Sequence, residues 1–147
     1  MNKHKIAVGS DHAGFVLKQA IIKHLIETGN EVKDYGCYSE DRADYPDFAH
    51  PVAKEVEAKK ADFGILICGS GNGINMTANK HKGIRSALCW NSEIAELARL
   101  HNNANIIALP ARYINEEEAK KSVNIFLNTP FEGGRHTDRV KKIGEGC

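Results

Sequence analysis

Short runs of apolar residues alternate along the chain with longer stretches in which apolar residues recur every three or four positions. The short runs are typical of β-strands, and the longer stretches are typical of amphipathic helices. The expected strands are residues 5–9, 31–36, 63–69, 84–89 and 105–110, and the expected helices are residues 13–29, 45–60, 72–83, 91–103 and 114–130. This alternation predicts an α/β fold whose parallel sheet is covered by helices on both faces.

The polarity of each run predicts its place in the sheet. Residues 63–69 (FGILICG) are apolar throughout, as in a strand that is covered on both faces. Residues 31–36 (EVKDYG) are more polar and are expected near a sheet edge. Gly29 is expected to end the first helix. Pro46 is expected to open the second helix, while Pro51 would favour a later start.

Three polar segments follow strands, and we expect them to meet at the carboxyl edge of the sheet, where ligands bind in this architecture. They are residues 10–12 (SDH), 37–47 and 68–73 (CGSGNG). Cys68 stands where a strand ends and the glycine-rich loop begins. From the residues alone, four roles stay open for this thiol: core filler, nucleophile, redox group and proton-transfer base.

Composition narrows the class of protein. The 147 residues, 41% hydrophobic and 27% charged with a net charge of +1, suit one soluble globular domain over residues 1–147. A balanced charge predicts no nucleic-acid partner. The N-terminus turns polar too early for a signal peptide or a membrane span, so a cytoplasmic protein is expected. Cys37, Cys68, Cys89 and Cys147 form no CxxC pair, which disfavours a zinc knuckle or a thioredoxin-type motif.

The chain lacks the residues that three known phosphate-binding motifs require at fixed spacings. The dinucleotide fingerprint GxGxxG requires a third glycine where Ile74 stands, and a cysteine phosphatase loop requires arginine at the same place. A Walker-type loop at Gly9 and Gly14 would place Phe15 and Val16 where lysine and serine or threonine belong.

The feature that remains is a loop of backbone N–H groups at the start of a helix. Such a loop can bind an anion or stabilise a developing oxyanion. A thiol in this position can have a lowered pKa. Together they would suit proton abstraction beside a carbonyl group. The alternative interpretation is that Cys68 is a small buried residue and that the glycines only make a tight turn.

Six motifs in a fixed order resemble those of ribose-5-phosphate isomerase B, a group of sugar-phosphate isomerases that includes galactose- and allose-6-phosphate isomerases. They span nearly the whole chain: GSDHAG (9–14), DYPDFA (44–49), ICGSGNGI (67–74), GIRSALC (83–89), ARLHNNANI (98–106) and FEGGRHTDR (131–139). The resemblance implies a Rossmann-like three-layer fold with a five-stranded parallel sheet. It also implies a homodimer or a dimer of dimers. The implied reaction interconverts ribose 5-phosphate and ribulose 5-phosphate through a cis-enediolate, without metal or nucleotide cofactor.

The resemblance also implies roles for individual residues. Some members carry a glutamate base just after the glycine loop; here that place is Ile74, so the chain is similar to members that use the preceding cysteine, which assigns Cys68 as base. His101 corresponds to the acid that opens the sugar ring, and Asp11 to its partner at the ring oxygen. The loop that holds O1 and O2, with Ser70 among the catalytic groups, corresponds to Gly69, Ser70, Gly71, Asn72 and Gly73.

The remaining implied roles concern the phosphate and the sugar hydroxyls. Asn102 corresponds to a hydroxyl contact and Tyr45 to the pocket wall, and the phosphate contacts are His12, Arg112, Arg135 and Arg139. Arginine forks and histidine suit a phosphate dianion. Taken alone, Arg135 and Arg139 would read as a solvated helix face, and His101 as a cation near a helix C-terminus. The resemblance implies that the tail from about residue 131 crosses to the partner subunit.

The sequence is compatible with three functions. The leading one is isomerisation of a five-carbon sugar phosphate. A six-carbon sugar phosphate is the near alternative, because the sequence does not define the depth of the pocket. A non-catalytic sugar-phosphate or nucleotide binder belongs to a different class, and the presence of both Cys68 and His101 argues against it.

Overall fold

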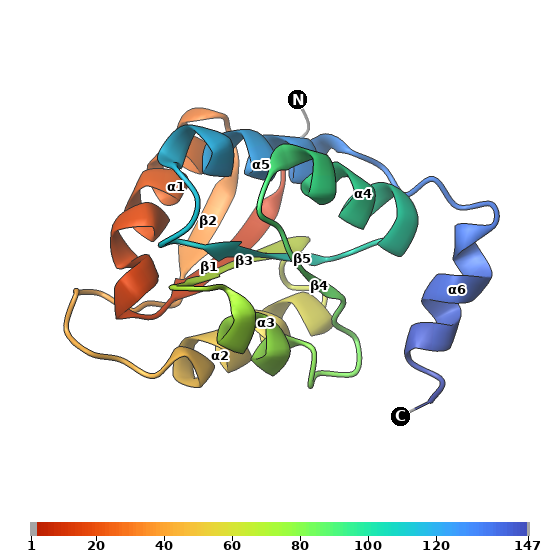
Figure 1. Cartoon of the computed structure of the whole chain (residues 1–147), viewed down its shortest axis with the longest axis horizontal. Coiled ribbons are helices and arrows are strands. Elements are labelled where there is room, and N and C mark those ends of the chain that lie inside the picture. Colours follow the sequence, from red (N-terminus) through yellow and green to blue (C-terminus); the bar gives the residue numbers. More distant parts are fainter. Residues whose placement is uncertain (1–2, 147) are drawn as a thin grey trace.

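The computed structural model describes residues 3–146, which form one five-stranded, all-parallel sheet between two layers of helices (Figure 1). The strands are β1 (Lys5–Ser10), β2 (Glu31–Asp34), β3 (Phe63–Cys68), β4 (Ser86–Leu88) and β5 (Ile106–Pro110), in the order β2-β1-β3-β5-β4. The α/β class with five parallel strands is therefore confirmed.

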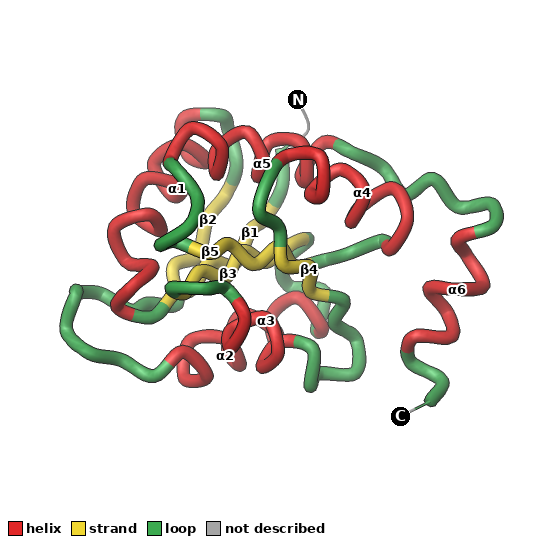
Figure 2. The backbone as a smooth tube through the Cα atoms, in the orientation of Figure 1, coloured by secondary structure: helices red, strands yellow, loops and turns green. Residues whose placement is uncertain are grey.

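The helices divide between the two faces of the sheet (Figures 1 and 2). One face carries α1 (Phe15–Glu27), α4 (Ser92–Asn102) and α5 (Glu116–Asn128), and the other carries α2 (Tyr45–Glu57) and α3 (Asn72–Ala78). A short 3-10 turn, η1 (His12–Gly14), precedes α1. Because successive strand residues point to opposite faces, Ile65 and Ile67 of β3 belong to the core beneath α1 and α5, while Leu66 packs in the core beneath α2.

The polarity of the strands predicted their positions correctly. β2 lies at an edge of the sheet, and β3 lies at its centre with every residue after Phe63 buried. Gly29 adopts a φ of +91° just after α1, where the N–H of Asn30 bonds to the carbonyl of Leu25, so its expected role at the helix end is confirmed.

The expected opening of the second helix at Pro46 is confirmed, and the later start that Pro51 would favour is not found. α2 begins at Tyr45 and continues through Pro51. Proline removes one backbone hydrogen bond from a helix interior. Here the helix is held against the sheet by a fully buried stripe that includes Ala49, Val52 and Ala53.

The α3–β4 connection makes both of its elements shorter than expected. α3 ends at Ala78, and β4 covers Ser86–Leu88 alone. The side chain of Asn79 donates to the carbonyl of Ser86 and accepts from its N–H, at 2.9 and 2.8 Å. This pair of bonds replaces the last helical turn and fixes the point at which the strand begins.

The C-terminal helix α6 (His136–Ile143) stands apart from the sheet, and its main contact is with α4 (Figure 1). Among the described residues, neither core contains a buried residue beyond Leu127. Within residues 3–146, no helix combines the length and the apolar character needed to cross a bilayer.

Candidate active site

The carboxyl ends of β1 and β3 form a pocket at the point where the chain order reverses, because β1 is followed in the chain by β2 on one side and is paired with β3 on the other. The pocket has a volume of about 400 Å³. Its lining residues are Asp11, His12, Ala13, Tyr45, Cys68, Gly69, Ser70, Gly73, Arg112 and Tyr113. The three polar segments expected at this edge therefore do meet.

The conformation of the glycine loop depends on two of its glycines. Gly71 caps α3 with a φ of +78°, in the left-handed region, and a Cβ there would collide with the side chain of Leu88. A Cβ on Gly73 would lie 2.5 Å from the ring of Tyr45. The glycines thus let the loop turn sharply and let the tyrosine ring lie against it.

Cys68 is the last residue of β3 and is buried, with 4% of its surface exposed. Burial raises the pKa of its thiol, and the Asp11 carboxylate raises it further. Hydrogen bonding to the backbone at Ile74, Gly71 and Ser70 opposes both. On balance the pKa of Cys68 is raised, so the lowered pKa considered from the sequence is not found. Without a ligand, the thiol is neutral and lies beside backbone amides that are suited to negative charge.

The other two described cysteines, Cys37 and Cys89, are also free and buried. Burial raises the pKa of Cys89 to about 12, as suits an inert core residue. Cys147 lies outside the described residues.

Asp11 and His12 join the first polar segment to its neighbours. Asp11 is 7% exposed, and its Oδ1 accepts the N–H of Gly14 at 3.2 Å, which caps η1. His12 Nδ1 lies 3.2 Å from both the nitrogen and the oxygen of Ala43, in the loop before α2. That contact engages Nδ1 with the loop and leaves Nε2 as the ring nitrogen for a ligand.

Arg112 follows β5 and lies against the glycine loop. Its N–H donates to the carbonyl of Gly69 at 3.0 Å, and a Cβ on Gly69 would come within 3.1 Å of its guanidinium. Among residues 3–146, no carboxylate forms an ion pair with Arg112. Its fork of donors is therefore available to an anion in the pocket.

Four of the residues that the resemblance assigns to the site lie away from this pocket: His101, Asn102, Arg135 and Arg139. His101 and Asn102 end α4 and so precede the amino end of β5, whereas Cys68 pairs with Pro110 at the carboxyl end of that strand. The length of β5, four steps of about 3.3 Å or roughly 13 Å, separates the two groups. Arg135 directly precedes α6, and Arg139 lies within it. Figure 1 shows α6 on the same side of the molecule as the end of α4.

From the sequence, His136 is only a weaker candidate for a phosphate contact, adjacent to Arg135 in a motif already singled out. It is 4% exposed, and its ring stacks on that of His101 with centroids 4.3 Å apart and planes 16° from parallel. Burial lowers the pKa of His136, and the His101 imidazole lowers it further.

Tyr113 lines the pocket but was not predicted from the sequence. Its signal was its position just after a strand at the same edge of the sheet.

One group of described residues has the composition of a metal site: His101, Glu132 and His136, with possible ligand atoms within 4.8 Å of one another. A metal bound by imidazole lies in the plane of the ring, about 2.0–2.1 Å from the nitrogen. Because the two rings are stacked nearly face to face, their in-plane lone pairs do not converge on one point. The described arrangement therefore fits a positioned histidine pair better than a chelating site.

Taken together, a buried thiol, a loop of backbone amides and an arginine that has no ion pair among the described residues form a pocket on an α/β fold that is suited to an anion and to acid–base chemistry. The chain belongs to the Ribose/Galactose Isomerase family, whose profile matches residues 6–143.

Individual relatives agree with the family. The chain is 48% identical to ribose-5-phosphate isomerase B of Escherichia coli (strain K12) over 139 residues, which cover 95% of this chain and 93% of that protein. A solved ribose 5-phosphate isomerase from Thermotoga maritima is 51% identical, with a TM-score of 0.95 and coverage of 97% and 98%. A ribose-5-phosphate isomerase B from Mycoplasma genitalium, solved with bound ribulose 5-phosphate, is 44% identical, with a TM-score of 0.93 and coverage of 99% and 97%.

Proposed function

We propose that this chain is an aldose–ketose isomerase that interconverts ribose 5-phosphate and ribulose 5-phosphate. The family match and the ribulose 5-phosphate bound by the Mycoplasma genitalium relative support the substrate class. The single observation that carries the chemistry is the placement of Cys68 in one pocket with Arg112, His12 and the glycine loop. A thiol suits proton transfer, and the cationic and donor groups suit a phosphate.

The base is the thiolate form of Cys68, a minor fraction that forms when the neutral thiol releases its proton to solvent. In the proton-transfer step, this thiolate removes the proton from C2 of the open-chain aldose and later delivers it to C1. The electron pair of the broken C–H bond forms the C1–C2 double bond, and the C1 carbonyl oxygen becomes the enediolate oxygen. The N–H groups of residues 69–73 stabilise this oxygen. The hydroxyl proton of O2 passes to O1, and the Ser70 hydroxyl, which lines the same pocket, is suited to carry it.

Ring opening and phosphate binding complete the assignment. Asp11 assists at the ring oxygen, Tyr45 forms the wall, and His12 and Arg112 hold the phosphate from within the chain. His101 supplies the acid for ring opening, Asn102 contacts a hydroxyl, and Arg135 and Arg139 add phosphate contacts. Because these four residues lie at the other end of the sheet from Cys68, they would come from a partner subunit.

The shared site requires a symmetric homodimer, in which each chain donates its α4–α6 end and receives that of its partner. Pairs of such dimers would give the dimer of dimers. The apolar surface of α6 supports a partner contact: Ile143 is 53% exposed, and a gap of about 290 Å³ separates Val140 and Ile143 from Ile84. The three cysteines that the structure describes are all free, which supports a reducing compartment, and we assign the protein to the cytoplasm.

The function is tested by incubating the purified protein with ribose 5-phosphate, allose 6-phosphate and galactose 6-phosphate and measuring ketose formation. We expect turnover of the pentose, because the whole chain matches pentose-phosphate relatives. Preferred turnover of either hexose would assign the six-carbon alternative. Binding of all three without turnover would assign the non-catalytic binder.

The role of Cys68 is tested with Cys68→Ala, for which we expect turnover to fall by about 10²–10⁴ while ribulose 5-phosphate still binds. Cys89→Ala is the matched control, because Cys89 is equally buried but belongs to the opposite core cluster and does not line the pocket. A Cys68→Ala variant with near-normal turnover would rule out the thiol as base.

A further inference from the structure

Two arginine side chains at the amino edge of the sheet have no carboxylate partner. Arg99 comes from α4 and is 8% exposed, and Arg85 precedes β4 and is partly buried. Within residues 3–146, no carboxylate oxygen lies within 4.0 Å of a nitrogen of either guanidinium. Both line one cavity of about 290 Å³, at the opposite ends of the strands from the Cys68 pocket.

The hydrogen bonds of these arginines use only part of their donor sets. Arg99 donates from Nε to the carbonyl of Thr129 at 3.1 Å, and from Nη1 to Asn103 Oδ1 and the carbonyl of Ala104, at 2.9 and 2.6 Å. Arg85 donates from Nε to the carbonyl of Asn103 at 2.9 Å. Among the described residues, Arg99 Nη2 and both terminal nitrogens of Arg85 have no acceptor. The cavity therefore contains unused guanidinium donors.

The charge in this cavity is unbalanced. Burial lowers the pKa of both arginines, and the charge of Arg85 lowers that of Arg99 further, so the two cations repel each other. Arginine nevertheless stays protonated in proteins. Lys59 adds a third positive charge to the lining, and Asp62 is its one carboxylate. Asp62 Oδ2 already accepts the N–H of Lys5 at 2.8 Å.

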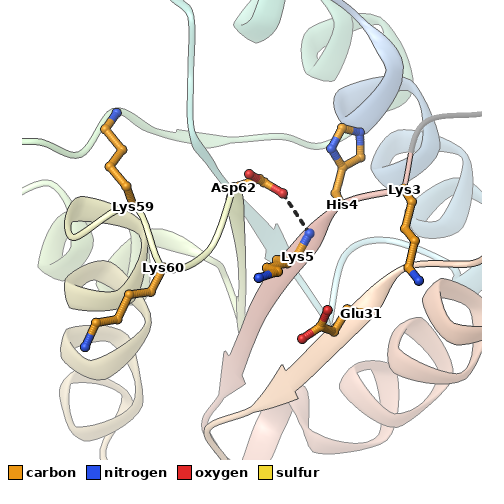
Figure 3. A pocket seen from close by; sticks show the side chains of 7 residues that line it. All are labelled: Lys3, His4, Lys5, Glu31, Lys59, Lys60 and Asp62. Atoms are coloured by element: carbon orange, nitrogen blue, oxygen red, sulfur yellow. Dashed lines mark hydrogen bonds between the residues drawn. The ribbon is translucent and has the colours of Figure 1, made fainter.

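A neighbouring pocket extends this positive region. It has a volume of about 560 Å³ and shares Lys59 and Asp62 with the arginine cavity. Figure 3 shows its lysine side chains coming from two places, Lys59 and Lys60 after the end of α2 and Lys3 and Lys5 at the start of β1. Among the described residues, the cations that line the two pockets are Lys3, Lys5, Lys59, Lys60, Arg85 and Arg99, and the carboxylates are Glu31 and Asp62.

We propose that the cavity lined by Arg85, Arg99 and Lys59 is a second anion site that binds a phosphate-type oxyanion. Two desolvated cations side by side are costly without a counter-charge, and a bound dianion would remove that cost. Guanidinium groups present planar pairs of N–H donors that match phosphate oxygens. The site is separate from the isomerase pocket, and its ligand would be inorganic phosphate or the phosphate group of a small molecule.

The test is a titration of the ¹⁵N-labelled full-length protein with inorganic phosphate, with sodium chloride at matched ionic strength as the reference. The reporters are the backbone amides of Asn103 and Asn105, which line the cavity. We expect saturable shifts at these amides. Amides of the glycine loop report separately on phosphate in the isomerase pocket, and Arg112→Gln should weaken that second response alone.

Variants assign the ligands. Arg85→Gln should weaken phosphate binding at the Asn103 and Asn105 reporters by about tenfold, as expected for the loss of one charge-assisted contact. Lys59→Gln changes an exposed residue, so it should keep the fold and weaken binding less. Lys121→Gln removes an exposed lysine that lines neither pocket and should have no effect. A parallel titration with pyrophosphate, repeated in Lys60→Gln, distinguishes one phosphate group from a longer ligand that reaches both pockets.

Three results would overturn the proposal. One is the absence of saturable shifts at Asn103 and Asn105 in the unaltered protein. Another is equal phosphate affinity in Arg85→Gln and Lys121→Gln. The third is that Arg85→Gln changes the oligomeric state, measured by sedimentation, but leaves the phosphate response intact. That outcome would mean that the arginines pair with a partner subunit.

Discussion

Burial and the Asp11 carboxylate hold the Cys68 thiol in its neutral form, while backbone amides oppose them. Because the pKa is raised, the thiolate fraction and the rate of alkylation by iodoacetamide should keep rising with pH past the ordinary pKa of cysteine. Asp11→Asn removes one of the raising influences and retains an acceptor for the N–H of Gly14. We therefore expect faster alkylation of Asp11→Asn than of the unaltered protein at any fixed pH below the pKa.

The control for this prediction is Asp62→Asn at the opposite edge of the sheet, which should leave the alkylation rate unchanged. Alkylation must be followed at Cys68 itself by peptide mass spectrometry, because Cys37 and Cys89 are also free. Isomerisation by Asp11→Asn should fall even as its thiol becomes more reactive. An unchanged or slower alkylation rate would show that Asp11 does not influence the thiol.

His136 stacks on His101 and is placed to orient the residue that we propose as the ring-opening acid. His136→Phe retains a flat ring and should keep most of the activity, whereas His136→Ala should lower kcat by about tenfold or more. The loss should be larger with ribose 5-phosphate, which must open its ring, than with ribulose 5-phosphate, which cannot form a furanose. If both variants instead raise KM alone, His136 is a phosphate contact.

Residue-scale properties were only partly predictable from the sequence. Cys68 could be located because it ends an apolar strand and begins a glycine loop. Its raised pKa could not, because the degree of burial and the distance to Asp11 depend on how β1 and β3 pair. His136 was only a weaker candidate for a phosphate contact, because a single histidine in a basic, polar tail carries no pattern that predicts a stacked, buried ring.

The glycine loop allows a matched test at the scale of an element. Gly71 and Gly29 both have positive φ, so alanine at either position costs roughly 1–2 kcal/mol of backbone strain. At Gly29 nothing lies within 4 Å of the new Cβ, whereas at Gly71 it meets Leu88. We expect Gly71→Ala to lower the free energy of unfolding more than Gly29→Ala, as measured by urea denaturation.

Activity should separate the two glycine variants further. Gly71→Ala displaces amides beside Cys68 and should lose most of its turnover, while Gly29→Ala, at the other end of the sheet, should keep it. Equal turnover in the two variants would mean that the exact path of the loop does not matter for the reaction.

From β1 to α5, element order and type followed from the hydrophobic pattern, because most strands are short apolar runs and the long helices bury one stripe of residues; β2 is more polar, and α6 buries only His136. The order of the strands within the sheet did not follow in full. β5 lies between β3 and β4, so that β4 is at the edge, and no local pattern in either strand predicts this arrangement. The error at Pro51 has a similar cause. Local propensity favoured a later start of the helix, but packing of α2 against the sheet outweighs the one lost hydrogen bond.

At the scale of the whole molecule, the C-terminal tail is a separable part of the structure. Neither core includes a residue beyond Leu127, and α6 rests mainly on α4. A chain that ends at Pro130 should therefore fold, with circular dichroism and a cooperative urea transition close to those of the full chain. It should be nearly inactive, because it lacks Arg135 and Arg139, and each lost charge-assisted contact costs about 1.5–3 kcal/mol.

The truncated chain also tests the shared site. It keeps Cys68 and the glycine loop, while full-length Cys68→Ala keeps His101, Arg135 and Arg139. If these groups meet across a dimer interface, a mixed dimer carries one complete site, in which the truncated chain supplies the pocket and its partner supplies the tail. Equal mixing makes about half of the dimers mixed, so activity should recover to roughly a quarter of that of the unaltered protein. If the groups instead meet within one chain, every site keeps a defect. The sample must be shown by native mass spectrometry to contain mixed dimers. If such a sample recovers no activity, Arg135, Arg139 and Cys68 of one site lie in the same subunit.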